Sequence, residues 1–440
     1  MVLEKIKAFF KKLNLKSYIL IFILLYAIMP IVPRATSRFL TTYFYMAIIV
    51  SAFLFTLFVC KLGDIKEYIV LILPFIIYAI LSMMISPEKN IVIAIYDALV
   101  VYVIPVGIGF YLTKNPFNAK TFAVVIVVAF TITCLTTIIG CIRNPEAARE
   151  LASTKTSDDA SKVSYDWQNI GGYSFVYSAV LFYPFVILGF KTKKLNIIFV
   201  LIFTALAIAL ALYTEYTFAL MLLLLSSLLF FIRKNISIKK FLLLMIVAFL
   251  AAYFLRYAVA ALLTYIGNML GNEMMTEKMT ALFLGNEAME QLDDPRDVLY
   301  LMSIETFLKN PIFGTYLSGG KGMGGHSHIL DTLAQMGAVG GALLIWMYSG
   351  IYKTFYKLFT KKTGGYIVFW IFLQTLILSL INTKMWLNNL CLFTPIMLYA
   401  IYPTEEKYED TVDRQHSFRP VRLSDLPKKD QRSVDGSSSE

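Results

Sequence analysis

Residues 197–214 read IIFVLIFTALAIALALYT, without one charged side chain. A helix needs about 17–25 apolar residues to cross the hydrocarbon core of a bilayer, because its backbone hydrogen bonds must be satisfied within the segment. Comparable stretches recur near 17–33, 39–60, 68–86, 91–113, 121–142, 173–190, 217–232, 241–263, 337–357, 366–382 and 385–402. The sequence therefore predicts an all-α integral membrane protein with about twelve transmembrane helices.

The composition of the chain supports the same class. Of its 440 residues, 58% are apolar or aromatic and 16% are charged, against about 45–50% and about 25% in soluble domains. These values exclude intrinsic disorder, a coiled coil, a collagen-like fibre and a small disulfide-stapled domain. The four cysteines lie in or beside apolar stretches and form neither a disulfide framework nor a zinc motif. We expect membrane lipid as the surroundings and no nucleic acid as a partner, although the net charge is +11.

The positive charges indicate the orientation. With the N-terminus inside, most of the 40 lysines and arginines fall on cytoplasmic segments, which follows the positive-inside rule. Both termini are then cytoplasmic, and only two outer segments are long. Residues 143–172 are rich in Ser, Thr and Asp, and we expect them to be partly disordered. The predicted organisation is a membrane domain over 1–402, a long extracytoplasmic loop over 264–336 within it, and a disordered cytoplasmic tail over 403–440.

The long outer loop contains a predicted helix. Asp294 and Pro295 form a start signal, and the helix is expected to run to Leu308 and to stop before Asn310. Arg296 would lie in its first turn, where a guanidinium can bind a phosphate group through two hydrogen bonds. The alternative is that Arg296 pairs with an acidic neighbour.

A glycine-rich stretch and two histidines follow. Residues 319–325 read GGKGMGG, which predicts a flexible segment, with Lys321 as a possible phosphate contact. A helix that begins near His326 would point this ring roughly 200° away from that of His328, so one metal ion could not easily bind both, and we expect no metal site. A neutral imidazole at a helix N-terminus can instead act as a general base. A purely structural role for His326 is the alternative.

Together these residues resemble the O-antigen ligase and polymerase superfamily of membrane glycosyltransferases. The family pattern has an arginine about fifteen residues before Pro-x-x-Gly, and later His-Asn-x-x-Leu-x-x-Leu-x-x-x-Gly-x-x-Gly entering a membrane helix. The chain matches it at the following positions: Arg296, Pro311, Gly314, His326, Leu330, Leu333, Gly337 and Gly340. The resemblance implies a GT-C-like architecture.

The chain departs from this pattern at three places. Ser327 stands in place of the asparagine after the motif histidine, and Tyr316 in place of the second glycine of Pro-x-x-Gly-x-Gly. The Thr-Gly-Ser-Arg-Gly turn of many relatives reads TEYTF at 214–218 and has no arginine. A second phosphate-binding cation must therefore come from elsewhere. The outer-side candidates are Arg143, Arg149 and Arg256, of which Arg256 is best placed, although it could instead snorkel to lipid headgroups.

The resemblance implies an inverting, metal-independent transfer of a glycan from undecaprenyl diphosphate, without a cofactor, at the outer face of a bacterial inner or cytoplasmic membrane. His326 would be the base and Arg296 the main diphosphate ligand, with Arg256 and Lys321 as weaker ligands. The favoured activity is polymerisation of lipid-linked oligosaccharide repeat units of an O-antigen, capsule or exopolysaccharide. A chain-length regulator and a flippase would be further partners.

Two alternatives remain. A ligase would use the same donor and the same motif but pass the glycan to another acceptor, such as lipid A core. A lipid-glycan flippase or transporter would also suit about twelve spans. Transporters place ionisable groups near the membrane midplane, however, and Asp97 and Glu215 are among the few acidic residues near predicted spans here.

Overall fold

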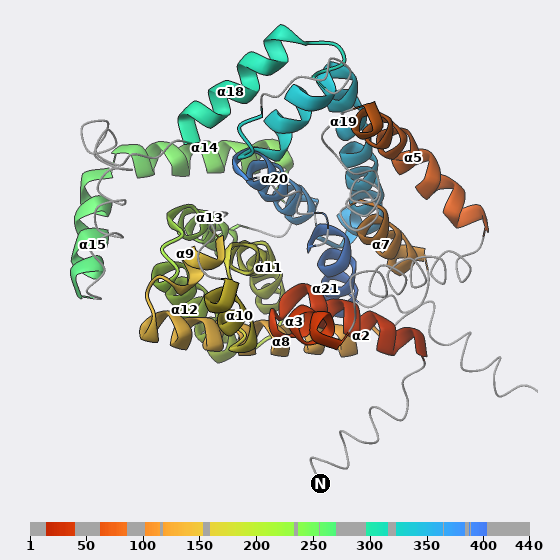
Figure 1. The fold of residues 1–440 in the computed structure, drawn as a ribbon. Helices are drawn as coiled ribbons and strands as arrows, with labels where there is room; N and C mark the ends of the chain where they lie inside the picture. Colours follow the sequence, from red (N-terminus) through yellow and green to blue (C-terminus); the bar gives the residue numbers. More distant parts are fainter. Residues whose placement is uncertain are drawn as a thin grey trace, which may run out of the picture. The chain divides into compact units, whose positions relative to one another are not determined.

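A computed structural model describes residues 15–39, 62–85, 102–114, 118–152, 159–232, 236–254, 256–269, 296–315, 323–363, 365–382, 387 and 389–402. All regular secondary structure in these ranges is helical, as the sequence predicts. The helices are α2 (Leu15–Ile28), α3 (Ile31–Phe39), α5 (Leu62–Ile85), α7 (Ile104–Lys114), α8 (Ala119–Arg143), α9 (Ala147–Ala152), α10 (Asp159–Trp167), α11 (Tyr173–Lys191), α12 (Ile197–Tyr213), α13 (Thr217–Ser227), η2 (Leu228–Phe230), α14 (Ile238–Phe254), α15 (Arg256–Met269), α18 (Arg296–Lys309), α19 (His328–Thr363), α20 (Tyr366–Ile381), η3 (Asn389–Phe393) and α21 (Thr394–Ile401) (Figure 1).

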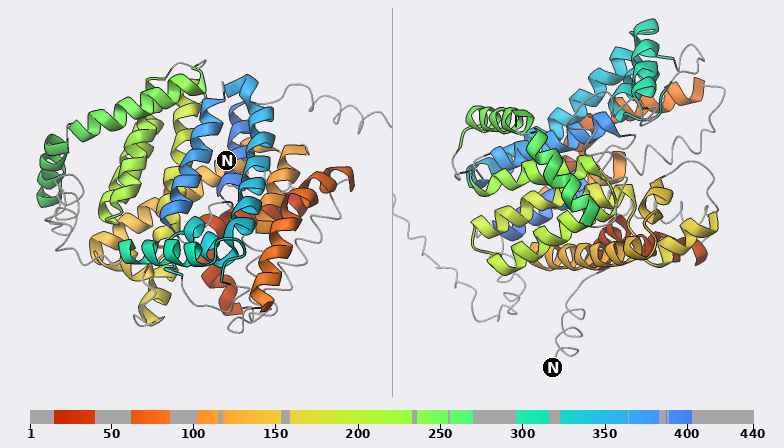
Figure 2. Two further views of the ribbon diagram at one scale, coloured as in Figure 1. Left: turned by 90° about the horizontal axis from the view of Figure 1, so that it is seen from above. Right: turned by 90° about the vertical axis from the view of Figure 1, so that its left-hand side faces the viewer.

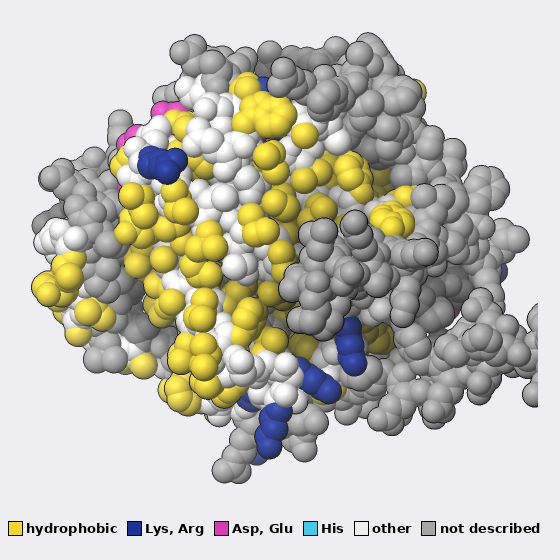
Figure 3. All heavy atoms as spheres, turned by 90° about the horizontal axis from the view of Figure 1, so that it is seen from below, with side chains coloured by type: hydrophobic (Ala, Val, Ile, Leu, Met, Phe, Trp, Pro, Cys, Tyr) yellow, Lys and Arg dark blue, Asp and Glu magenta, His cyan; other side chains and the backbone are white. Residues whose placement is uncertain are grey.

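The described helices have the character of membrane spans. Four of them, within Lys66–Ile85, Ala119–Arg143, Tyr173–Lys191 and His328–Thr360, are long and apolar enough to cross a bilayer, and several shorter apolar helices accompany them. Large hydrophobic side chains are exposed at helical spacing along α8, at Val124, Val128, Ile132, Leu135, Ile139 and Ile142. Figure 3 shows hydrophobic side chains gathered over much of one face of the molecule. Such a surface is suited to lipid, so the chain is a multi-pass membrane protein.

The core is built around α11, whose residues from Phe175 to Gly189 are all buried. This helix packs against α12, α13 and α20. Its Phe182 ring stacks on Phe130 of α8 with centroids 4.7 Å apart. A buried hydrogen bond of 2.6 Å from the Asn389 amide to the Ser178 hydroxyl joins α11 to η3. In lipid, this kind of interhelical polar contact holds helices together where burial of apolar groups cannot.

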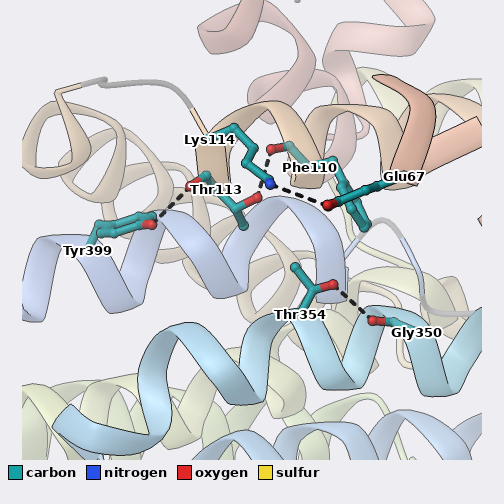
Figure 4. Close-up of polar contacts among 7 residues, drawn as sticks. All are labelled: Glu67, Phe110, Thr113, Lys114, Gly350, Thr354 and Tyr399. Atoms are coloured by element: carbon teal, nitrogen blue, oxygen red, sulfur yellow. Dashed lines mark hydrogen bonds and ion pairs between the residues drawn. The ribbon is translucent and has the colours of Figure 1, made fainter. Parts of the chain in front are cut away.

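Polar contacts join the ends of several helices on one side of the molecule. At one end, the Lys114 ammonium lies 3.3 Å from the Glu67 carboxylate, and the Tyr399 hydroxyl donates a 3.3 Å hydrogen bond to the Thr113 carbonyl (Figure 4). Lys191 at the end of α11 donates to the Leu229 carbonyl of η2, which follows the end of α13 directly. These contacts join the beginning of α5 to the ends of α7 and α21, and the end of α11 to η2.

The opposite ends are joined in the same way. The Asn169 side chain, before α11, accepts from the Ile31 amide of α3 and donates to the Thr133 and Thr136 hydroxyls of α8. The Tyr216 hydroxyl, in the turn after α12, donates to the Ala148 carbonyl of α9. The ends of α2, α8 and α12 and the beginning of α11 therefore belong to one side of the molecule.

Some boundaries differ from the sequence prediction. The predicted span 17–33 is divided into α2 and α3 at Pro30, which has no backbone N–H to donate. The predicted span 241–263 consists of two helices, α14 and α15, and the charged Arg256 begins the second. Residues 143–172 contain α9 and α10, and the expectation that this segment is partly disordered stays a prediction, because 153–158 are not described. The expectations for 40–60, 91–101 and the tail 403–440 fall on residues that are not described.

Candidate functional site

The helix predicted in the long loop is present. α18 spans Arg296–Lys309, so its end lies one residue beyond the predicted Leu308 and before Asn310 as expected. It packs against α19, and the Tyr300 hydroxyl donates a 3.1 Å hydrogen bond to the Ile381 carbonyl at the end of α20. Three helices therefore meet beside the segment that carries the two histidines. The proposed cap residues Asp294 and Pro295 precede the described part of α18.

The segment before His326 lies directly on the first turns of α18. A Cβ atom added to Gly324 would come within 1.9 Å of the Leu299 carbonyl oxygen, which only glycine avoids. Leu299 lies one helical turn after Arg296. The fold therefore brings the backbone of the histidine segment to the end of α18 that begins at Arg296, although the Arg296 side chain itself is not described.

Asp331 fastens this segment in place. Its carboxylate accepts hydrogen bonds from the Ser303 hydroxyl of α18 at 2.6 Å, from the Gly325 amide at 3.3 Å and from the Ser327 amide at 3.2 Å. The Ser303 hydroxyl also accepts from the Gly324 amide at 2.9 Å. A carboxylate in the first turn of a helix is further favoured by the helix dipole. Asp331 thus links α18, the histidine segment and α19.

His326 lies outside the helix rather than in its first turn. α19 begins at His328, and the Ser327 hydroxyl caps it by accepting from the Leu330 amide at 3.1 Å. Serine is a preferred N-cap, and it sets the start of the helix two residues later than expected. His326 therefore shares no helical face with Leu330, which corrects the prediction. Its side chain is exposed.

His328 occupies a different environment, which the motif did not single out. Its amide donates a 2.6 Å hydrogen bond to the Asn382 carbonyl, and its ring Nε2 lies 3.4 Å from the Tyr102 hydroxyl. The ring is partly buried. Its position as first residue after a serine cap is the signal that could have identified it as structural. Within the described ranges, no group of three or more His, Cys, Asp or Glu residues could hold a metal ion.

Two glycines of the sequence pattern contact each other. Gly314 (φ +68°) and Gly337 (φ +63°) both have left-handed backbones, and Gly337 kinks α19. A Cβ on Gly337 would lie 2.3 Å from the Ile312 oxygen, and one on Gly314 would lie 2.3 Å from the Gln335 oxygen. The Ala338 amide donates to the Pro311 carbonyl at 2.8 Å. The Pro311–Gly314 turn is therefore seated, backbone against backbone, in the kink of α19.

The other proposed cations are not brought to this site by any described contact. Arg256 begins α15, which packs against α14, and its side chain is not described. Lys321 lies in 316–322, outside the described residues. Arg143 ends α8 with an exposed side chain, and Arg149 lies in α9 with a side chain that is not described. Arg256 and Lys321 therefore stay predictions.

Comparison with known proteins gives no family for this chain. No family model matches it, and no curated protein matches it. A functional assignment therefore depends on the residues and on their arrangement.

Proposed function

We propose that this protein is a polysaccharide polymerase that joins undecaprenyl-diphosphate-linked repeat units at the outer face of a bacterial cell membrane. The observation that carries the proposal is the contact between Gly324 and Leu299, because Gly324 lies two residues before the exposed His326 and Leu299 lies one helical turn after Arg296. A base and a phosphate-binding cation from segments about thirty residues apart would then serve one substrate.

The chemistry needs few groups. His326 would remove the proton from an acceptor sugar hydroxyl as its oxygen attacks the anomeric carbon of the donor. A new glycosidic bond forms, the bond from that carbon to the diphosphate oxygen breaks, and the lipid diphosphate leaves with the bonding electrons. Arg296 would bind the diphosphate and stabilise its growing negative charge. Attack opposite the leaving group inverts the configuration at carbon.

The pattern of helix ends supports a transmembrane arrangement with alternating spans. The ends joined by Lys114 and Glu67, by Tyr399 and Thr113, and by Lys191 and Leu229 are those that a cytoplasmic N-terminus assigns to the inner side. The ends joined around Asn169 are those assigned to the outer side. The proposal includes about twelve spans, a GT-C-like architecture and cytoplasmic termini. It places α18 and the two histidines His326 and His328 on the outer side.

The decisive experiment is reconstitution of the purified full-length protein with a defined lipid-linked oligosaccharide in detergent. We expect a ladder of longer lipid-linked products. Transfer only to an added lipid A core acceptor would instead indicate a ligase. A transporter forms no longer product where there are no compartments, so the absence of any glycan transfer would overturn the proposal.

Three variants test the roles of the residues. His326→Ala should lower the rate by about 10²–10⁴-fold, the range typical of a lost general base. His328→Ala, two residues away, should cost much less, because the fold uses its backbone amide rather than its ring to join Asn382. Arg296→Lys keeps the charge but loses the two-pronged phosphate contact, so it should also slow transfer. Full-length polymer from the folded His326→Ala variant would contradict the assignment.

A further inference from the structure

We propose that α18 and the turn after it are immersed in the headgroup region of the outer leaflet of the bilayer, with the large apolar side chains of the exposed face in contact with lipid. The outer side is the one assigned under the proposed function, whereas the contact with lipid does not depend on the chemistry.

The exposed face of α18 carries large apolar side chains together with one charged pair. Val298 is 66% exposed, Leu301 57% and Leu308 67%, and the exposed side chains continue into the following turn at Ile312 and Phe313. In contrast, Ser303 and Thr306 on the other face are buried. Lipid, rather than water, is the medium that favours this distribution, because exposing large hydrophobic groups to water is costly.

The depth of the turn follows from its contact with α5. The Tyr78 hydroxyl donates hydrogen bonds to the Phe313 carbonyl at 3.2 Å and to the Met336 carbonyl at 2.7 Å. At 1.5 Å per residue, the stretch of α5 from Tyr78 to its end at Ile85 measures about 10 Å. The turn is therefore attached about 10 Å below the end of a helix that is itself a candidate membrane span.

The lipid-facing surface of α5 continues into this region. Its large apolar side chains on both sides of Tyr78, namely Ile77, Leu81, Met84 and Ile85, are exposed. If the membrane ended at the level of the turn, the last two turns of α5 would present these groups to water. The exposed apolar side chains of α18 and α5 therefore form one continuous surface. This continuity, rather than the exposure of α18 alone, identifies the bilayer as what covers the exposed face of α18.

One charged pair lies on the same face. Glu305 and Lys309, one helical turn apart, form an ion pair of 3.6 Å with both side chains exposed. Helices that lie in the membrane interface commonly combine an apolar face with charged groups whose flexible side chains reach the headgroups. Figure 2 shows α18 (teal) crossing the long part of α19 (blue), as expected of a helix that does not itself span the membrane.

Immersion of α18 would determine the position of the proposed active site relative to the membrane surface. Because Gly324 is seated on Leu299 and Asp331 on Ser303, the segment with His326 moves with α18. A helix held in the outer leaflet would keep that segment at the level of lipid headgroups, where the diphosphate of a membrane-anchored donor lies.

Spin labels at introduced cysteines test the immersion in lipid nanodiscs. Leu301→Cys and Leu308→Cys report on the face of α18. Leu201→Cys, exposed on the membrane helix α12, is the lipid reference, and Ser164→Cys, exposed on α10, is the aqueous reference. The unsubstituted chain is the blank, and its described cysteines, Cys134, Cys141 and Cys391, are buried. Molecular oxygen concentrates in hydrocarbon and a neutral nickel chelate in water, so their collision rates distinguish the two media.

We expect both α18 labels to resemble Leu201→Cys, with frequent collisions with oxygen and at least a several-fold deficit of nickel relative to Ser164→Cys. Nickel access equal to that of Ser164→Cys would overturn the proposal. Low access of both reagents would also overturn it, because it would mean that protein, such as a second copy of this chain, covers the face. Neither outcome depends on glycan transfer, so the result is independent of the proposed function.

Discussion

Replacement of Gly337 by alanine should separate the Pro311–Gly314 turn from α19. Gly337 has φ +63° and ψ −163°, a conformation almost restricted to glycine, which costs another residue about 1–3 kcal/mol. The added Cβ would lie 2.3 Å from the Ile312 oxygen and 2.6 Å from the Gly314 nitrogen. Both are backbone atoms, which cannot rotate away, so the turn must withdraw.

The withdrawal breaks two hydrogen bonds. The Ala338 amide donates to the Pro311 carbonyl at 2.8 Å and the Val339 amide to the Ile312 carbonyl at 3.2 Å. Each contributes about 0.5–1.5 kcal/mol. With the backbone strain, the local contact should lose about 2–6 kcal/mol, and each 1.4 kcal/mol corresponds to a tenfold change in equilibrium.

Hydrogen exchange of the purified protein measures this loss. The Ala338 and Val339 amides should exchange about 30-fold to 10⁴-fold faster in Gly337→Ala. Gly325→Ala is the matched control, because Gly325 also has a positive φ of +70° but no atom lies within 4 Å of the added Cβ. It isolates the backbone strain, which alone costs about 1–2 kcal/mol. Equal protection of Ala338 and Val339 in the two variants would refute the account of the interlocked turn.

Three further predictions test other parts of the fold. Asp331→Ala removes the acceptor of three hydrogen bonds, so the Gly325 and Ser327 amides should exchange at least about tenfold faster; unchanged exchange would show that Asp331 does not hold the segment. Burial raises the pKa of the Asp166 carboxyl above its ordinary value, although the Arg34 charge opposes this, so the native state favours the protonated form and its stability falls as the pH rises above that value. Asp166→Asn should therefore raise the melting temperature at pH 7 but not at pH 3, and a loss of stability at pH 7 would contradict this reasoning. In intact cells, a membrane-impermeant maleimide should label Ser164→Cys directly but Lys194→Cys only after permeabilisation, and the reverse pattern would invert the proposed topology.

The sequence predicted the helices well where the signal for a helix lies within the segment itself. The apolar stretches at 121–142, 173–190 and 197–214 correspond to α8, α11 and α12, and the predicted loop helix corresponds to α18. These agree because length, apolarity and breaker residues act within one segment. The sequence analysis expected the helix to begin near His326, but α19 begins at His328, because the Ser327 side chain accepts a free amide of the first turn.

The amino-acid sequence by itself determined that the chain is helical and that lipid is its solvent, because hydrophobicity and backbone hydrogen bonding are properties of each segment. Only the tertiary structure decided that Gly324 rests on Leu299, that Gly314 and Gly337 interlock, and that Asp331 joins α18 to α19. These contacts join segments that are far apart in the chain. The connections between them are long and rich in glycine, so the sequence does not fix the path that they follow. A close approach of two backbones depends on the shapes of both segments and on how they are oriented toward each other. The spacing of residues within either segment does not encode this.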